Sequence, residues 1–303
     1  MQNDVFNYVN RISAVKTFKG VDKNGFSSLV FIFREKPNFE LKTTKISTRI
    51  LEVSPNEFRL FLSLLDDDNV STEIFDILSE DLLSIIEKAK TELEVQEILS
   101  TRFQYWSELF KRKREKLDEK WIQGYIGELW YLYEILIKKV GVEEAVKSWI
   151  GPEKANQDFI TKDKIFEIKT RSSLSPTIKI SNENQLNTNM YLVVIDTEKS
   201  SPIFKESYTL SILINKICSK IDSPELMRYF KKKLLEIDLY PIEELRLYEK
   251  FAYIIKTHTY YLIEEKFPII AHANVPEGIV RYQYDLMVKT IADFSIKEEN
   301  VWY

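Results

Sequence analysis

The sequence has few of the residues that cross-link chains or bind soft metals. Its 303 residues include one cysteine, Cys218, and two histidines, His258 and His272. A single cysteine cannot form a disulfide within the chain, and one cysteine with two histidines is too few for a zinc cage. Any metal ion that this chain binds is therefore expected to be held by oxygen ligands. Each histidine stands alone in the sequence, and we expect both to be structural.

Long apolar runs and targeting signals are also missing. The longest apolar run is Met190–Ile195, about six residues against the ~20 that a membrane-spanning helix needs. The first residues, Met-Gln-Asn-Asp-Val, have neither the basic flank nor the apolar stretch of a secretion signal. The sequence therefore predicts no membrane segment and a cytoplasmic location.

The charge balance is slightly acidic, with 43 Lys and Arg against 47 Asp and Glu and a net charge of −4. The chain as a whole has no basic field that would draw it to nucleic acid, although a local basic patch would still act. A hydrophobic share of 44% with 13% aromatic residues indicates an ordered globular protein. The length suggests about two domains.

The N-terminal part is predicted to be rich in strands and to end in helices. Leu29–Phe33, Phe39–Leu41 and Phe58–Leu62 are short apolar runs separated by turn signals, and each is interpreted as a strand. Ser79–Asp81 has the composition of a helix start. Thr91–Glu94 fits a capping box that opens a long amphipathic helix.

That helix ends in a basic run, for which two interpretations stay open. The run contains Lys111, Arg112, Lys113 and Arg114. Its cations could contact DNA phosphates, or they could be a solvated helix end that favours the negative end of the helix dipole. Asp118 then restarts a helix, which places a domain boundary near residues 110–118. No Gly-rich or Pro-rich linker marks the boundary, so we expect packed domains.

The helix that follows, from Asp118 to about residue 139, carries an acid beside its apolar stripe. The predicted stripe contains Trp121, Tyr125, Leu129, Leu132 and Leu136. At 100° per residue, Glu128 lies about 60° from Tyr125, at the edge of the stripe. Gly124 and Gly127 flank it and would let a backbone or a metal approach closely. Glu128 is either an ordinary boundary residue or part of a functional site.

The segment Asp158–Lys169 is predicted to form two short strands joined by a polar turn. Because side chains alternate along a strand, Phe166 and Ile168 should point into the core. Glu167 and Lys169 should then share the opposite face, near Asp158. Two carboxylates suit a hard divalent cation, and the lysine adds a positive charge that carboxylates cannot supply.

Further strands are predicted at Thr177–Ile180 and Tyr191–Ile195. With the helix and the hairpin they make one α/β unit, a mixed sheet with flanking helices. We expect three segments: a β-rich domain at 1–112 for recognition or partner binding, this core at 113–200, and an α+β extension packed on it at 201–303. Arg171 and Lys179, together with the basic run of residues 111–114, are candidate DNA contacts.

A set of short motifs, in this order, resembles the PD-(D/E)XK nuclease superfamily. The motifs are Gly124-Tyr125-Ile126-Gly127-Glu128-Leu129, Trp149-Ile150-Gly151-Pro152, Asp158-Phe159, Glu167-Ile168-Lys169-Thr170, and Ile180-Ser181 with Gln185-Leu186. More narrowly, the chain resembles a bacterial family of PD-(D/E)XK proteins often assigned to restriction or phage-defence gene sets. Gln157 stands where the name-giving pattern has proline, a departure that leaves the chemistry intact.

The resemblance implies a restriction-endonuclease-like core that uses Mg²⁺, with Mn²⁺ able to substitute. It implies Asp158, Glu167 and Glu128 as metal ligands, Lys169 as the catalytic lysine and Gln185 as a supporting residue. A metal between the two hairpin acids would lower the pKa of a bound water and polarise a phosphate, and the lysine would offset developing charge.

Two main functions remain open from the sequence, with an RNA substrate or a different metal-dependent hydrolase as a minor third option. The first is a metal-dependent DNA endonuclease, a subunit of a restriction or defence system that works with partner subunits or as a homodimer suited to double-strand cleavage. The second is a non-cleaving DNA-binding or scaffold subunit that keeps the fold. The intact Asp158, Glu167 and Lys169 favour the first, and the acidic charge balance favours the second.

Overall fold

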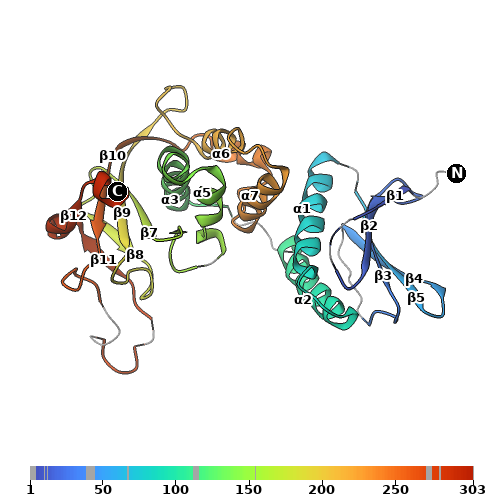
Figure 1. Cartoon of the computed structure of the whole chain (residues 1–303). Coiled ribbons are helices and arrows are strands. Elements are labelled where there is room, and N and C mark those ends of the chain that lie inside the picture. Colours follow the sequence, from blue (N-terminus) through green and yellow to red (C-terminus); the bar gives the residue numbers. More distant parts are fainter. Residues whose placement is uncertain are drawn as a thin grey trace. The chain divides into compact units, whose positions relative to one another are not determined.

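The computed structural model describes residues 5–9, 11, 13–38, 45–66, 68–111, 116–153, 155–270, 275–279 and 281–302. The chain divides into two compact units, residues 1–114 and 115–303, which are described separately (Figure 1). None of the helices in the described ranges combines the length and the apolar character that a membrane span requires.

The first unit contains a five-stranded antiparallel sheet. Its strands are β1 (Val5–Tyr8), β2 (Lys16–Val21), β3 (Ser27–Phe33), β4 (Ile46–Ser54) and β5 (Glu57–Leu64), in the order β1-β2-β3-β5-β4. The strands predicted at Leu29–Phe33 and Phe58–Leu62 are confirmed as parts of β3 and β5. The strand predicted at Phe39–Leu41 lies outside the described residues.

Two helices, α1 (Asn69–Ile86) and α2 (Glu92–Lys111), lie on one side of this sheet (Figure 1). The predicted helix start at Ser79 is wrong. Asp68 already caps α1 by accepting a 2.8 Å hydrogen bond from the Ser71 N–H, and the helix then continues through Ser79, which is buried in its middle. The start of α2 is confirmed, because Thr91 Oγ1 accepts from the Glu94 N–H at 3.2 Å.

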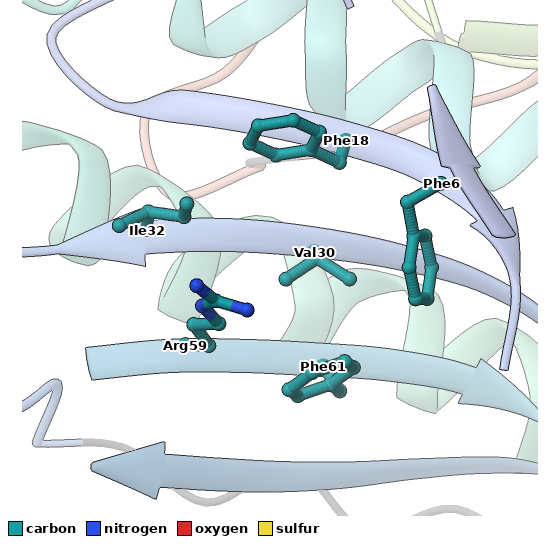
Figure 2. A pocket seen from close by; sticks show the side chains of 6 residues that line it. All are labelled: Phe6, Phe18, Val30, Ile32, Arg59 and Phe61. Carbon is teal, nitrogen blue, oxygen red and sulfur yellow. The ribbon is translucent and has the colours of Figure 1, made fainter. Parts of the chain in front are cut away.

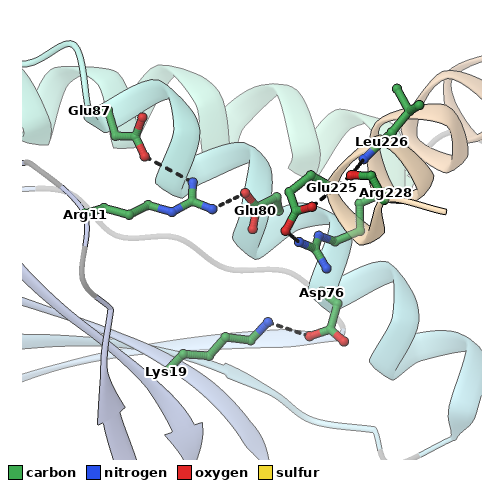
Figure 3. A network of polar contacts seen from close by, with 9 residues as sticks. Arg11, Lys19, Asp76, Glu80, Glu87, Glu225, Leu226 and Arg228 are labelled. Atoms are coloured by element: carbon green, nitrogen blue, oxygen red, sulfur yellow. Dashed lines mark hydrogen bonds and ion pairs between the residues drawn. The ribbon is translucent and has the colours of Figure 1, made fainter. Parts of the chain in front are cut away.

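Ion pairs connect the strand segments of the first unit to α1. Figure 3 shows Arg11 paired with Glu80 and, at 3.2 Å, with Glu87, and Lys19 paired with Asp76 at 2.7 Å. All of these side chains are partly exposed. Each pair is therefore expected to contribute little to stability, but together they place cations of the strand segments against acids of α1.

The second unit is built on a mixed five-stranded sheet. Its strands are β6 (Phe159–Ile160), β7 (Ile165–Ser172), β9 (Tyr191–Ser200), β10 (Ala252–Leu262) and β12 (Ser295–Ile296), in the order β12-β10-β9-β7-β6. β7 and β9 are parallel, and the other neighbours are antiparallel. Two further strands, β8 (Thr177–Ile180) and β11 (Tyr284–Met287), form a separate antiparallel pair.

Residues beyond 200 supply β10 and β12 to this sheet, so its hydrogen bonding crosses the boundary that was expected between the core and a C-terminal extension. On one face of the sheet, β8 and β11 close an apolar core that includes Ile178, Leu192, Val194, Ile263 and Leu286. The fold is an α+β protein with a mixed central sheet and flanking helices, as the sequence predicts.

Helices cover the rest of the second unit. They are α3 (Glu119–Trp130), a π-helical segment η1 (Tyr131–Leu136), α4 (Ile137–Val140), α5 (Val142–Ser148), the 3₁₀ turn η2 (Gly151–Glu153), α6 (Leu210–Cys218), α7 (Pro224–Glu236), the 3₁₀ segments η3 (Ile242–Tyr248) and η5 (Val288–Phe294), and α8 (Glu298–Trp302). α3 packs on β7, and α6 packs on α3. Asp118 caps α3 through the Trp121 N–H at 2.9 Å, which confirms the predicted start.

The predicted apolar stripe of α3 is only partly correct. Leu129, Leu132 and Leu136 are fully buried, but Trp121 is 61% exposed, and Ile122 and Ile126 are buried in its place. Within α3 itself, each spacing of four residues drifts by about 40° around the helix, so Trp121 lies about 80° from Leu129 whereas Ile122 lies only about 20° from it.

Candidate active site

Strand β7 brings Glu167 and Lys169 together on one face. Phe166 and Ile168 are buried on the other face, as the alternation of side chains predicts. Lys169 Nζ lies 2.7 Å from Glu167 Oε1. Glu167 is only 1% exposed, and its second oxygen, Oε2, is buried without a hydrogen-bond partner. Among the residues that the structure describes, no donor reaches this oxygen.

Asp158 stands directly before β6 and is fixed at both its backbone and its side chain. Its N–H donates to Phe166 O at 3.2 Å, and its C=O accepts from the N–H groups of Ile150 and Gly151 at 2.9 and 3.1 Å. Its Oδ2 accepts from the Ile168 N–H at 2.7 Å. The hairpin therefore places Asp158 beside the middle of β7.

Glu128 reaches this cluster from α3. The indole N–H of Trp149 donates to Glu128 Oε2 at 2.8 Å. Gly151 lies against both acids, because a Cβ at this position would be 3.2 Å from Asp158 Oδ1 and 3.3 Å from Glu128 Oε2. The loop that carries Trp149 and Gly151 therefore contacts both the helix acid and the hairpin acid, and a side chain at position 151 would require them to shift.

The two glycines of α3 differ in their surroundings. A Cβ at Gly127 would lie 1.8 Å from Thr170 Oγ1, so this glycine lets α3 pack directly on β7, as the sequence predicts. No atom would lie within 4 Å of a Cβ at Gly124, where no close approach occurs.

Gln185 positions the lysine. Its Oε1 accepts from Lys169 Nζ at 3.0 Å and from the Ser181 N–H at 2.8 Å. The ammonium group is therefore held between the carboxylate of Glu167 and the amide of Gln185. These two contacts restrict the orientation of the ammonium group.

Burial shifts the ionisation of all three acids. It raises the pKa of Asp158 to about 6, with Lys169 and the Ile168 N–H opposing the shift. It raises the pKa of Glu167 to about 8, and the charge of Asp158 adds to this while Lys169 opposes it. It also holds the pKa of Glu128 well above its usual range, with Asp158 contributing next.

Lys169 remains a cation in this environment. Burial by itself lowers its pKa, but the neighbouring carboxylates, Glu167 first and then Asp158, outweigh burial and raise it. The site thus contains one buried cation and three acids whose raised pKa values disfavour their joint ionisation near neutral pH. A divalent cation would supply the missing positive charge.

The donor set fits Mg²⁺ held by two carboxylates. Across the described ranges, no group of three or more His, Cys, Asp and Glu side chains is arranged to hold a metal ion. Mg²⁺, however, is ordinarily bound through one or two carboxylates, with waters and substrate phosphates completing its shell. Asp158 and Glu167, with the unpartnered Oε2, meet that requirement. The three-carboxylate set that includes Glu128 stays a prediction.

The predicted DNA contacts differ in their exposure and in whether the structure describes them. Arg171 is held inside the fold, since its Nε donates to Asp196 Oδ1 at 2.6 Å and its Nη1 to Ser175 O at 2.7 Å. Its guanidinium is therefore engaged within the fold, and its role as a DNA contact stays a prediction. Lys179 is exposed on β8. The side chain of Lys111 and all of Arg112, Lys113 and Arg114 lie outside the described residues.

Of the two histidines, only His258 lies among the described residues. His258 Nε2 lies 3.0 Å from Glu298 Oε2, and its ring packs against Trp130, which is a structural arrangement. His272 lies outside the described residues.

One residue near the site has no role predicted from the sequence. Lys233 on α7 is buried, donates to the carbonyl oxygen of Trp149, and pairs with Glu153 at 2.9 Å. It lies in a run of three lysines, a pattern that is typical of a solvent-exposed surface. Its spacing of seven from Leu226 and three from Phe230, both buried, is the helical signal that could have identified it.

The fold and the site are those of the PD-(D/E)XK class. They combine a mixed sheet with flanking helices, Asp158 directly before one strand, and Glu167-Ile168-Lys169 on the next strand. The family model described as "Putative PD-(D/E)XK family member, (DUF4420)" matches residues 6–289, and the chain belongs to this family. No match was found among curated proteins or among solved structures.

Proposed function

We propose that the protein hydrolyses phosphodiester bonds in DNA with the help of Mg²⁺, for which Mn²⁺ can substitute. The observation that supports this best is the buried, unpartnered Oε2 of Glu167 beside Asp158 and Lys169. A buried acceptor without a donor is costly to a fold, and a bound cation would satisfy it.

Asp158 and Glu167 would hold the ion, which when bound would lower the pKa of a coordinated water and polarise the scissile phosphate. The Ile168 N–H keeps Asp158 oriented, and Glu167 would have to be ionised to serve as a ligand. Lys169, oriented by Gln185, stabilises the negative charge that develops on the phosphate oxygens. Glu128 supports the site through Trp149 and, as an acid on α3, would position a water.

The alternative is a DNA-binding or scaffold subunit that does not cleave. It is favoured by the acidic charge balance and by the internal pairing of Arg171. Buried ionisable clusters cost free energy, however, and apolar residues of similar size are often neutral or stabilising in their place. A scaffold would gain nothing from keeping Asp158, Glu167 and Lys169 together, so we favour the nuclease.

The setting of this activity is also a proposal. The family resemblance supports a subunit of a bacterial restriction or phage-defence system in the cytoplasm. A homodimer would place two sites on the two strands of a duplex and would suit double-strand cleavage.

The test is cleavage of supercoiled plasmid DNA with Mg²⁺, Mn²⁺ or EDTA by the wild type, Asp158→Asn and Lys169→Met. Asp163→Asn is the matched control, because Asp163 is an exposed acid in the turn of the same hairpin. Metal-dependent cutting by the wild type and the control, lost in both site variants, is the expected result. If the wild type neither cuts nor binds Mn²⁺ in a manner that depends on Asp158, the scaffold function replaces this one.

A further inference from the structure

The sheet of the first unit has a second face, opposite the one on which α1 and α2 lie. Side chains on this face alternate with the buried residues that point toward the helices. Six of them line a cavity of about 350 Å³: Phe6, Phe18, Val30, Ile32, Arg59 and Phe61. Figure 2 shows them projecting from β1, β2, β3 and β5 on the same side of the sheet. We call this surface, with its strand neighbours, the aromatic face.

The aromatic face presents flat rings close to one another. The rings of Phe6 and Phe61 meet edge to face with centroids 6.1 Å apart, and those of Tyr8 and Phe18 do so at 5.5 Å. Phe6 and Phe18 are only half-buried, and Tyr8 is 54% exposed. Exposed aromatic rings that are grouped rather than scattered indicate a binding surface.

Cations surround these rings. Arg59 lines the cavity and is oriented by Glu57, which accepts from its Nε at 2.8 Å and pairs with its Nη2 at 2.7 Å. The guanidinium of Arg49, which is exposed, lies 4.7 Å from the centroid of the Phe61 ring. Lys16 is paired with Ile32 in the strand register, so it projects from the same face.

The charge of the first unit is divided between its sheet and its helices. Residues 1–65 contain ten Lys and Arg against six Asp and Glu, whereas residues 66–100 contain two against eleven. The strand-bearing half is therefore basic although the chain as a whole is acidic. Four of these cations pair with acids of residues 66–100: Arg11, Lys19, Arg34 and Lys45. An anionic partner would therefore be attracted by the cations on the aromatic face itself, Lys16, Arg49 and Arg59, and repelled by the acids of the helices.

We propose that the aromatic face binds an unpaired segment of DNA. Its bases would stack on the rings of Phe6 and Phe18, and its phosphates would lie near Arg49, Arg59 and Lys16. Aromatic rings interleaved with cations on an open sheet are the combination that binds single-stranded nucleic acid, because every base has a face to stack and every phosphate a charge to pair. An apolar peptide would not use the cations, and a closed duplex presents no base faces to the rings.

The inference rests on the proposed function in that it takes DNA as the substrate. It assigns to the first unit the recognition of substrates with exposed bases, such as a single strand or an unwound stretch of duplex. Binding on this face does not require Asp158, Glu167 or Lys169, so it can be measured in the absence of metal and of cleavage.

The experiment measures fluorescence anisotropy of a labelled oligothymidine of about 12 nucleotides with the full-length protein in EDTA. A duplex of equal length is measured in parallel. We expect the single strand to bind more tightly than the duplex, and Phe18→Leu and Arg49→Gln each to raise Kd by about tenfold. Lys88→Gln is the matched control, because it removes an exposed cation of the same unit near the end of α1. Its Kd should stay within about twofold of the wild type. Melting curves establish that each variant is folded.

Halogenated uracil at one position of the oligonucleotide, crosslinked by light and mapped by mass spectrometry, locates the contact independently. Crosslinks to peptides that contain Phe6, Phe18 or Phe61 support the proposal. Equal binding of duplex and single strand with no effect of Phe18→Leu overturns it, and so does a wild type that fails to bind the oligonucleotide. A protein that binds the single strand through this face but cuts no DNA with Mg²⁺ would refute the proposed nuclease and leave this inference standing.

Discussion

Trp149 donates its indole N–H to Glu128, with 2.8 Å between Nε1 and Oε2. The carbonyl oxygen of the same Trp149 accepts a hydrogen bond from Nζ of Lys233, on α7. One aromatic residue therefore connects the acid on α3 to a buried lysine more than 80 positions further along the chain. This chain of contacts determines where the loop with Gly151 lies against Asp158.

Trp149→Phe should weaken the fold while keeping its packing against Phe230. Glu128 would lose its donor in an environment where burial already raises its pKa, so we expect the free energy of unfolding to fall by about 1–3 kcal/mol. In the wild type the bond from Trp149 lowers the pKa of Glu128, so its loss should raise that pKa further and hold Glu128 neutral more firmly. Urea unfolding curves measure the loss. Trp121→Phe, an exposed tryptophan of the same unit, should change the free energy by less than about 0.5 kcal/mol, and equal curves for the two variants would contradict the role of Trp149.

Lys233→Met should disturb the site from a distance. The methionine fills the space but leaves the Trp149 carbonyl without its donor, so we expect a loss of about 1–3 kcal/mol of unfolding free energy. Displacement of the Trp149 loop should also slow plasmid cutting by about tenfold. Lys220→Met, at an exposed lysine beyond α6, is the control. A variant that is as stable and as active as the wild type would mean that Lys233 is a replaceable buried ion.

The metal-free protein should lose stability as the pH rises. The pKa values of Asp158 and Glu167 are raised to about 6 and about 8, so the folded state retains protons that the unfolded chain has released. The contribution of these two acids to the free energy of unfolding should therefore be greatest below about pH 4 to 5. It should fall as the pH rises through 6 to 8, by several kcal/mol in total.

Urea unfolding in EDTA at about pH 5.5 and about pH 8 measures this difference. Asp158→Asn should flatten the dependence, because it removes one titrating group and the charge that raises the pKa of Glu167. Mg²⁺ should restore stability at the higher pH, since it binds the ionised acids of the folded state. A stability that rises from the lower to the higher pH in EDTA, in both proteins, would contradict the burial of these acids.

Gly151→Ala should slow plasmid cutting, whereas Gly124→Ala should leave cutting unchanged and raise stability. The new Cβ at Gly151 would crowd Asp158 Oδ1 and Glu128 Oε2, at 3.2 and 3.3 Å, so the acids must move by a few tenths of an ångström. We expect plasmid cutting to slow by about tenfold. The new Cβ at Gly124 meets no atom within 4 Å, so the gain in helix propensity should add about 0.5–1 kcal/mol of stability without loss of cutting. Equal cutting rates in the two variants would contradict the close packing at Gly151.

Short sequence patterns correctly predicted the elements that depend on interactions between neighbouring residues. The hairpin from Asp158 to Lys169, the cap at Thr91 and the restart at Asp118 each depend on a few neighbouring residues, and the structure contains all three. The helix start at Ser79 failed because a stronger cap, Asp68, lies a few turns earlier. The burial of Trp121 was predicted wrongly because two successive spacings of four residues drift by about 80° around an α-helix, which takes Trp121 off the face of Leu129.

The sequence by itself determined that two acids and a lysine lie on one hairpin with a mixed sheet around it, while their role as oxygen ligands of a metal ion stays a prediction. Only the tertiary structure decided which charges are buried and what they contact. Glu167 keeps an unpartnered oxygen, Arg171 is occupied by Asp196, and Lys233 points inward rather than to solvent. The physical reason is that alternation and capping act over a few residues. Desolvation and hydrogen-bond pairing depend instead on segments that the fold brings together from distant parts of the chain.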